Sequence, residues 1–330
     1  MPETKYVLLL AAILGCAAVF TLAGGTERLH LSLDSTNDTE SELSSELTAE
    51  LERGHFLDVE TGVVPKRVFS PKMRMVFPVG LEGTGHHLLN PVLHSVCALD
   101  AVVCPDACGF PLALYDHLGN PATTADYATG LLLLRQEMET LAEIRDGLGD
   151  GMVAFATFAN CHEGYMSYPM LSGPNKPLQH VDLKILAREA ERMAIDLRFL
   201  YLGRSAKNIL ISDTEHRNIG GGFVREARVL INAASVISSS FAEVDPDFIT
   251  CLSYDNITDP TQTSRIAEVV VPTPGLADRI THSIELLTED QAGEANATDS
   301  VVVDEQRRIG WRLMSNRLQE KLDYIERNFC

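Results

Sequence analysis

The amino-acid sequence predicts an α/β fold of three layers, in which a central parallel sheet is flanked by helices on both faces. Short apolar runs such as MVAFATF, residues 152–158, are typical of strands that are buried on both faces of a sheet. Such runs alternate with longer segments of helical spacing, and this alternation is typical of a parallel sheet. At 330 residues and 45% hydrophobic content, the chain can bury a large core.

The expected elements follow one another along the chain from an apolar strand that starts at residue 76. The further expected strands are residues 152–158, 197–202 and 248–252. The expected helices are residues 87–99, 131–148, 178–192, 223–242, 261–270 and 315–328. Residues 104–127 and 275–303 show no regular pattern and are expected to form irregular surface segments.

A glycine-rich turn, GLEGTGHH, joins the first strand to the first helix over residues 80–87. Backbone N–H groups in such a turn, together with the positive end of the following helix, can bind a phosphate or a sulfate. Gly83 and Gly85 allow the backbone to approach an anion closely. The turn is not a Walker A loop, because His86 and His87 stand where that loop needs Lys and then Ser or Thr.

The N-terminal region predicts entry into the secretory pathway. Residues 6–23 form an uncharged apolar run of about the minimum length that spans a bilayer. We interpret the run as a signal anchor, and a cleaved signal peptide is the alternative. Residues 1–5 would then be a cytoplasmic tail, residues 24–54 a disordered lumenal stem and residues 55–330 the folded domain.

Glycosylation sequons at Asn37, Asn256 and Asn296 are compatible with this route. The net charge of −19 argues against nucleic acid as a partner, because nucleic-acid phosphates require a positive protein surface. An acidic protein can still bind a small anion in a local basic pocket.

The cysteines indicate disulfides more than metal binding. One of the seven lies inside the apolar run, and the other six could form disulfides in an oxidising compartment. Cys97, Cys104 and Cys108 are close enough in sequence for a local bridge. A zinc site is disfavoured, because the chain has no CxxC pair with a matching second pair.

The segment LRFLYLGRSAKNILISDTEHR, residues 197–217, carries a resemblance to a known family. An apolar strand ends in Arg204, and Ser212 follows eight residues later on the next helix. This spacing can place a guanidinium and a hydroxyl on one phosphate. It resembles the 3′-phosphate site of sulfotransferases that use 3′-phosphoadenylyl sulfate (PAPS).

Two further segments support the resemblance. Residues 247–270 are similar to the family's strand that ends in Tyr and an acidic residue, followed by a DP turn, and Tyr254 would contact the adenine. Residues 307–330 resemble the Trp-plus-basic segment of carbohydrate sulfotransferases, where Arg308 would add a phosphate contact. The resemblance implies the P-loop-like form of the three-layer fold. It assigns the donor site to Gly83, Thr84, Gly85, His86, His87, Arg204, Ser212, Tyr254 and Arg308.

The catalytic base should project from the segment that follows the strand at residues 152–158. Within it, His162 titrates near neutral pH, and Glu163 could serve if burial raised its pKa. The family's first loop carries a basic residue that this chain lacks, and His86 or His87 would have to replace it. The sequence leaves His162 and Glu163 as alternative bases.

The resemblance implies a Golgi sulfotransferase, anchored as a single-pass type II membrane protein with a lumenal catalytic domain, or secreted if the N-terminal segment is cleaved. It would transfer a sulfonate from PAPS, without a metal, to a hydroxyl or amine of a glycan or another secretory acceptor. Two alternatives stay open. One is a catalytically silent member of the fold that binds a nucleotide or a glycan, and the other is a divergent P-loop kinase, which the absent loop lysine disfavours.

Overall fold

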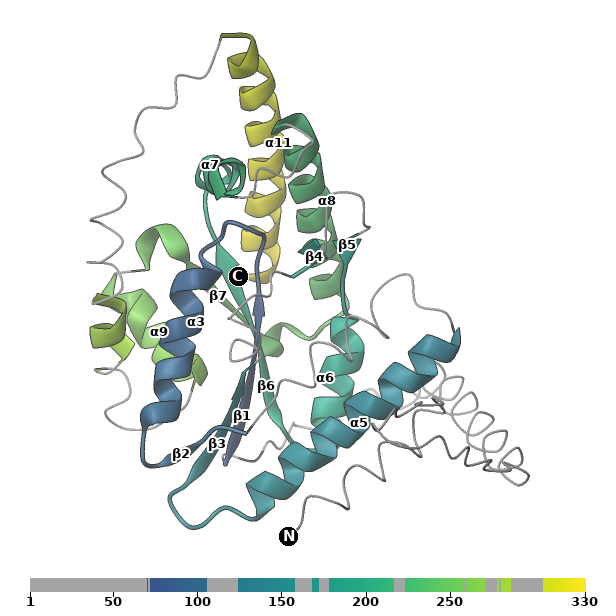
Figure 1. The fold of residues 1–330 in the computed structure, drawn as a ribbon, viewed down its shortest axis with the longest axis vertical. Coiled ribbons are helices and arrows are strands. Elements are labelled where there is room, and N and C mark those ends of the chain that lie inside the picture. The colour runs from purple at the N-terminus through teal and green to yellow at the C-terminus, as the bar shows by residue number, and fades with distance from the viewer. Residues whose placement is uncertain are drawn as a thin grey trace, which may run out of the picture. The chain divides into compact units, whose positions relative to one another are not determined.

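The computed structural model describes residues 70, 72–105, 124–157, 168–171, 178–216, 223–257, 259–270, 278, 280–285 and 305–330. All of them lie in one compact unit, Gly62–Cys330. Their centre is a sheet of five parallel strands: β1 (Met73–Val79), β2 (Val102–Val103), β3 (Val153–Thr157), β6 (Asp196–Gly203) and β7 (Ile249–Ser253). Helices cover both faces of the sheet, so the predicted α/β class is confirmed (Figure 1).

The strand order β2-β3-β1-β6-β7 places a topological switch point at the carboxyl ends of β1 and β6. After β1 the chain moves toward β2, whereas after β6 it moves the opposite way, toward β7. Neighbouring strands whose connections leave in opposite directions mark the point where ligands bind in doubly wound sheets. The loops that follow Val79 and Gly203 are therefore where a ligand is expected to bind.

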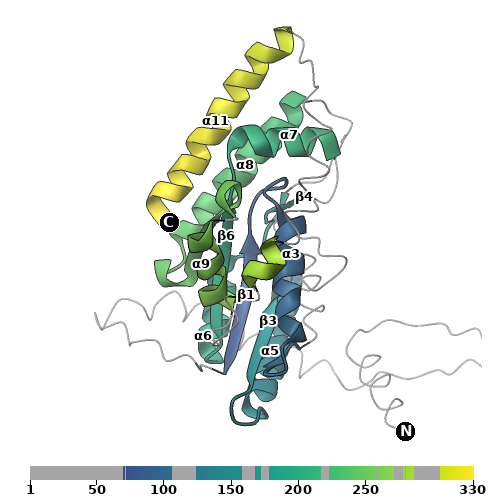
Figure 2. The ribbon, with the colours of Figure 1, turned by 90° about the vertical axis from the view of Figure 1, so that its left-hand side faces the viewer.

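One face of the sheet is covered by α3 (His86–Ser95) and α9 (Pro260–Val270). This layer is turned toward the viewer in Figure 2. Apolar side chains from both helices form a buried cluster with Val76, Leu200 and Leu252 of the strands. Because side chains alternate along a strand, these residues point to one face and their sequence neighbours to the other.

The other face is covered by α5, α6 and α8, with α7 and α11 packed on α8. These helices span Thr124–Asp146 (α5), Leu183–Arg192 (α6), Ala206–His216 (α7), Phe223–Ala242 (α8) and Glu305–Phe329 (α11). Aromatic rings fill this layer. Phe77 meets Phe199 and Tyr168 edge-on at 6.0 and 5.7 Å between ring centroids. Tyr201 meets Phe241 at 5.9 Å in the same manner.

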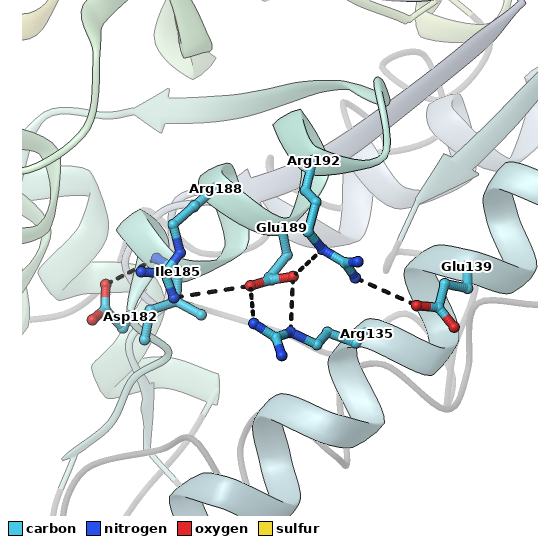
Figure 3. Close-up of polar contacts among 7 residues, drawn as sticks. All are labelled: Arg135, Glu139, Asp182, Ile185, Arg188, Glu189 and Arg192. Carbon is cyan, nitrogen blue, oxygen red and sulfur yellow. Dashed lines mark hydrogen bonds and ion pairs between the residues drawn. The ribbon is translucent and has the colours of Figure 1, made fainter. Parts of the chain in front are cut away.

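A buried carboxylate joins α5 to α6 (Figure 3). Only 1% of the Glu189 side chain is exposed, and it accepts bonds from Arg135 Nε at 3.2 Å and Arg192 Nε at 2.8 Å. Arg188 lies 3.9 Å away, and Arg192 also reaches the exposed Glu139 at 3.5 Å. The charge of Glu189 is thus compensated by guanidinium groups from its own helix and from the neighbouring one.

Some element boundaries differ from the predicted ones. Residues 178–192 were expected to form one helix, but Leu178–Gln179 are strand β5, paired with β4 (Met170–Leu171). Asp182 then caps α6 by accepting the backbone N–H groups of residues 184 and 185. An N-cap residue has extended backbone, so the helix begins after Asp182.

Further differences concern the length of two helices, one segment predicted to be irregular and one short strand. Helix α5 begins seven residues before the predicted start, and α11 begins ten residues before it. Residues 280–285, predicted as part of a surface excursion, are helical and bury Ile280 and Ile284 in the apolar cluster. Strand β2 was not predicted, because two residues carry too little periodicity to be recognised.

Two disulfides are present among the described residues. Cys97 is bonded to Cys104, so the predicted local bridge is confirmed for this pair. Cys251 of β7 is bonded to Cys330, which ties the end of α11 to the edge strand. No helix within the described ranges is both long and apolar enough to span a membrane. The predicted anchor, residues 6–23, lies outside those ranges.

Candidate functional site

The glycine-rich loop and Arg204 lie side by side because β1 and β6 are neighbours. Val79, the last residue of β1, is in register with Tyr201 of β6. The loop leaves β1 at Gly80, and Arg204 follows directly after Gly203, the last residue of β6. Both therefore emerge at the carboxyl edge of the sheet, at the switch point of the strand order.

Left-handed backbone shapes the loop. Gly83 has φ +81° and Gly85 has φ +105°, conformations that residues with a Cβ rarely adopt. Between them, Thr84 is buried and its hydroxyl donates to the Leu81 carbonyl at 2.7 Å. Gly85 is the N-cap of α3, and its carbonyl accepts from the N–H groups of Leu88 and Leu89.

The start of α3 has the geometry of an anion site. The first N–H groups of a helix have no acceptor within the helix. In α3 these groups include the backbone N–H groups of His86 and His87. Partial positive charge collects at such a terminus. The predicted loop residues thus stand where an oxyanion could be bound by main-chain donors. The side-chain positions of both histidines lie outside what the structure describes.

Helix α7 packs directly against the loop. A Cβ placed on Gly83 would lie 3.0 Å from the Ile209 carbonyl oxygen and 3.3 Å from the Ser212 Cβ. Ser212, predicted from its spacing to Arg204, is therefore adjacent to the glycine loop. A side chain at position 83 would force the loop and α7 apart.

Arg204 is held by three neighbours. Its Nη1 donates to the Gly83 carbonyl at 2.6 Å, and its Nε lies 3.7 Å from Asp255 Oδ1. The guanidinium carbon sits 4.5 Å from the centre of the Tyr254 ring, a cation–π contact. Only one of the five guanidinium N–H donors is committed to Gly83. The side chain is 20% exposed, so it remains accessible to a ligand.

Tyr254 also contacts the loop. A Cβ on Gly85 would lie 2.1 Å from two carbons of the Tyr254 ring, far inside van der Waals contact. The sequence interpretation gave Gly85 the role of letting the backbone approach an anion. In the structure the space that its missing side chain leaves is filled by this ring, so Gly85 also serves a packing contact. Tyr254 lies between Arg204 and the start of α3.

Asp255 is a residue of this site that sequence reasoning left without a role. Its carboxylate accepts from the Ser205 N–H at 2.9 Å and from the Asn208 side-chain amide at 2.9 Å, so it caps the start of α7. The sequence showed an acidic residue after Tyr254, but the capped helix lies about fifty positions earlier. Only the adjacency of β6 and β7 brings the two together.

Helix α11 adds a further carboxylate near the end of β6. Glu326 Oε1 would lie 3.0 Å from a Cβ on Gly203. Burial raises the pKa of Glu326, and the charges of Asp323 and Asp255 raise it further. The ends of β6 and β7 thus combine one guanidinium with several carboxylates. An anionic ligand at Arg204 would have to overcome their repulsion.

The predicted catalytic residues are not among the described ones. His162 and Glu163 fall within residues 158–167, and the side chain of Arg308 is likewise outside the description, although its backbone belongs to α11. Tyr168, just after that segment, donates its N–H to the Gly80 carbonyl at 3.1 Å. The chain that follows His162 and Glu163 therefore returns to the glycine loop. In the described part of the molecule, no group of three or more His, Cys, Asp or Glu residues is arranged to hold a metal ion.

Comparisons with known proteins found similarity among solved structures only. No protein-family model matches the chain, and no curated protein matches it. Among solved structures, the chain is similar to the sulfotransferase domain of the olefin synthase from Synechococcus PCC 7002. The two share 13% sequence identity, the match covers 80% of this chain and 99% of that domain, and the TM-score is 0.33. At this TM-score, no residue role is transferred from that domain to this chain.

Proposed function

We propose that this protein is a PAPS-dependent sulfotransferase that transfers a sulfonate group to a hydroxyl or amine of a glycan or another secretory acceptor. The observation that supports it is the convergence of Gly83, Arg204, Ser212 and Tyr254 at the carboxyl edge of the sheet. These residues come from three separate segments of the sequence, of which residues 197–217 and 247–270 resemble the family and the glycine loop departs from it in lacking the basic residue.

In this proposal the helix N-terminus and the loop N–H groups bind the sulfonate and the adjoining 5′-phosphate. Arg204 and Ser212 bind the 3′-phosphate, since a guanidinium supplies charge and a hydroxyl supplies one more donor. Tyr254 packs against the adenine, and Arg308 adds a further contact. His86 or His87 takes the place of the basic loop residue and stabilises negative charge on the bridging oxygen.

The transfer is an in-line displacement at sulfur. The acceptor oxygen or nitrogen forms a bond to sulfur while the bond from sulfur to the bridging phosphate oxygen breaks, which releases adenosine 3′,5′-bisphosphate. His162 or Glu163 takes the proton of the acceptor. The return of the chain to Gly80 at Tyr168 supports a position near the loop for this base. No step requires a metal.

The proposal includes a location. The protein would be a type II membrane protein of the Golgi, with residues 6–23 as its anchor and the domain in the lumen. The two disulfides fit an oxidising compartment of this kind.

A second candidate is a catalytically silent member of the fold that binds a nucleotide or a glycan. Asp255 beside Arg204 favours it, because a carboxylate there competes with a 3′-phosphate for the guanidinium. A divergent P-loop kinase is less well supported, since no lysine follows the loop glycines.

Isothermal titration of the full-length protein with PAPS, and separately with ATP and Mg²⁺, discriminates these functions. PAPS binding is expected, and Arg204→Ala should weaken it by about 1.5–3 kcal/mol, as for a lost charged hydrogen bond. Arg317→Ala, an exposed arginine on α11, is the matched control and should bind as the unchanged protein does. Binding of ATP with Mg²⁺ but not of PAPS would refute the sulfotransferase proposal.

Transfer of labelled sulfate from PAPS to a panel of glycans then tests turnover. Loss of transfer in the His162→Ala, Glu163→Ala double variant, with PAPS binding retained, is expected. PAPS binding without transfer to any acceptor would favour the silent alternative, and full activity of the double variant would remove both proposed bases.

A further inference from the structure

A separate cleft lies at the other end of the sheet from the glycine loop, with a volume of about 320 Å³. Its walls are the first three residues of β7, the α9 residues Arg265 and Glu268, and the end of α11, with Arg74 of β1 and Arg198 of β6. We call it the arginine cleft. Arg74 is the second residue of β1, and Gly80 follows six residues later, about 20 Å away along an extended strand. The cleft is therefore distinct from the proposed PAPS site.

Two of the three arginines are fixed in place by the fold. Arg74 Nη2 pairs with Asp196 at 2.7 Å, and its Nη1 donates to the Glu268 and Val269 carbonyls at the end of α9. Arg198 Nε pairs with the same Asp196 at 2.9 Å. One carboxylate is thus shared between two guanidinium groups. Their geometry is set before any ligand arrives, which lowers the entropic cost of binding.

Arg198 and Arg265 bring further positive charge to the walls. Arg198 Nη1 donates to the Asp247 carbonyl at 2.6 Å. Arg265 makes one long bond, at 3.5 Å, to the Cys251 carbonyl. No carboxylate in the described ranges lies within ion-pair distance of Arg265. The walls therefore hold three guanidinium groups, and the acidic side chains beside them are Asp196 and Glu268.

Three guanidinium groups on the walls of one cleft are unusual in a chain whose net charge is −19, and they favour an anionic ligand. Guanidinium groups match the planar pairs of oxygen atoms on phosphate and sulfate. The volume is at the lower end of that of small-molecule sites, which suits an ester of a small polar molecule. Strand β7 is at the edge of the sheet, so its outer main-chain groups face away from the other strands.

We propose that the arginine cleft binds the phosphate or sulfate group of a small polar ester, with Arg74, Arg198 and Arg265 as the anion-binding residues and Glu268 as the residue that limits affinity. Arg265 is exposed and, among the described residues, makes only one long bond, so it can turn toward the ligand. The proposal does not depend on the PAPS site.

Arg265→Ala and Glu268→Gln test the cleft, because both residues are exposed and their loss should leave the fold intact. Arg317→Ala on α11 is the matched control. The full-length protein is titrated with glucose 6-phosphate and glucose 6-sulfate at constant ionic strength, with glucose and sodium chloride as blanks. The expected result is that Arg265→Ala weakens binding at least tenfold, that Glu268→Gln tightens it several-fold, and that the control changes nothing. The two esters show which oxyanion the cleft prefers.

Equal affinity in the unchanged protein, Arg265→Ala and Glu268→Gln would overturn the proposal, as would the absence of binding by both esters. A crystal soaked in selenate supplies an independent measurement of position. An anomalous peak within hydrogen-bond distance of the Arg265 guanidinium is expected. A crystal whose cleft shows no such peak, with its opening free of neighbouring molecules, would also contradict the assignment.

Discussion

The ring of Tyr254 occupies the space that a side chain on Gly85 would need, with two ring carbons 2.1 Å from the ideal Cβ position. One consequence is that this contact helps to pack the N-terminus of α3 against the end of β7. Because the same ring lies 4.5 Å from the guanidinium of Arg204, a change at position 85 should be transmitted to the proposed phosphate site.

Gly85→Ala should destabilise the protein more than an ordinary glycine replacement. Both Gly85 and Gly151 have positive φ, but a Cβ on Gly151 would meet nothing within 4 Å. Gly151→Ala therefore measures the backbone strain alone, about 1–2 kcal/mol. Gly85→Ala adds an overpacking cost of about 1–3 kcal/mol, measured by urea denaturation.

The double variant Gly85→Ala, Tyr254→Ala separates packing from strain. Removing the ring makes room for the new methyl group, so Gly85→Ala should cost less in the Tyr254→Ala background than in the unchanged protein. Additive losses in the two backgrounds would show that the ring does not restrict position 85.

Asp255→Ala should have opposite effects on stability and on PAPS affinity. The carboxylate caps α7 through the Ser205 N–H, so its removal costs about 1 kcal/mol of stability. It also lies 3.7 Å from Arg204 Nε, so its removal should strengthen the binding of an anionic donor. Urea denaturation and isothermal titration with PAPS measure the two effects.

Asp259→Ala is the matched control for Asp255→Ala. Asp259 caps α9 through the Thr261 N–H at 2.8 Å, in the same manner as Asp255 caps α7. A similar loss of stability with unchanged PAPS affinity is expected for it. Weaker PAPS binding in Asp255→Ala would mean that the orientation of Arg204 by Asp255 outweighs the repulsion.

Glu189→Gln should be strongly destabilising for a change that preserves shape. The carboxylate is 1% exposed and compensates Arg135 and Arg192, so its neutralisation leaves two guanidinium groups without their shared partner. Because both arginines are partly exposed, we expect a loss of about 1–3 kcal/mol in urea denaturation. Glu139→Gln, whose carboxylate is 54% exposed and contacts the same Arg192, should cost less than about 1 kcal/mol. Equal losses would contradict the role of burial.

The class of fold was predictable from sequence because the pattern that signals it is local. Apolar runs at β1, β3, β6 and β7 alternate with segments of helical spacing, and each run is long enough to be recognised alone. The relative position of Arg204 and Ser212 was predictable for a similar reason. They are eight residues apart, and the chain between them leads from the end of one strand into the next helix. Their adjacency to Gly83 required only that β1 and β6 be neighbours in the sheet.

The roles of Asp255 and Glu189 were not predictable, because both depend on contacts between distant segments. Nothing near Asp255 in the sequence indicates that it caps a helix that begins at Ala206. A glutamate on a helix is usually exposed, so the sequence does not indicate that Glu189 is buried. It is buried because α5 packs against α6. Strand pairing and helix packing supply this information, and one-dimensional periodicity does not contain it.

The disulfide between Cys251 and Cys330 should contribute more to stability than the one between Cys97 and Cys104. The sequence separations are 79 and 7 residues, and closing a longer loop removes more entropy from the unfolded chain. In the chain-entropy model the difference is about 2 kcal/mol. Urea denaturation of Cys330→Ser and Cys104→Ser measures it. A larger loss in Cys104→Ser would show that native contacts around each bridge, and not loop closure, determine its contribution.

His180 should make stability fall as the solution is acidified. Burial lowers the pKa of His180 below its ordinary value of 6.5, and Asp182 only partly opposes the shift. Between the folded and unfolded pKa values the unfolded chain binds more protons, so the free energy of unfolding decreases as pH falls through this window. Urea denaturation at several pH values from 5 to 8 should show this slope in the unchanged protein. The slope should be smaller in His180→Gln. An unaltered slope in His180→Gln would assign the pH dependence to other groups.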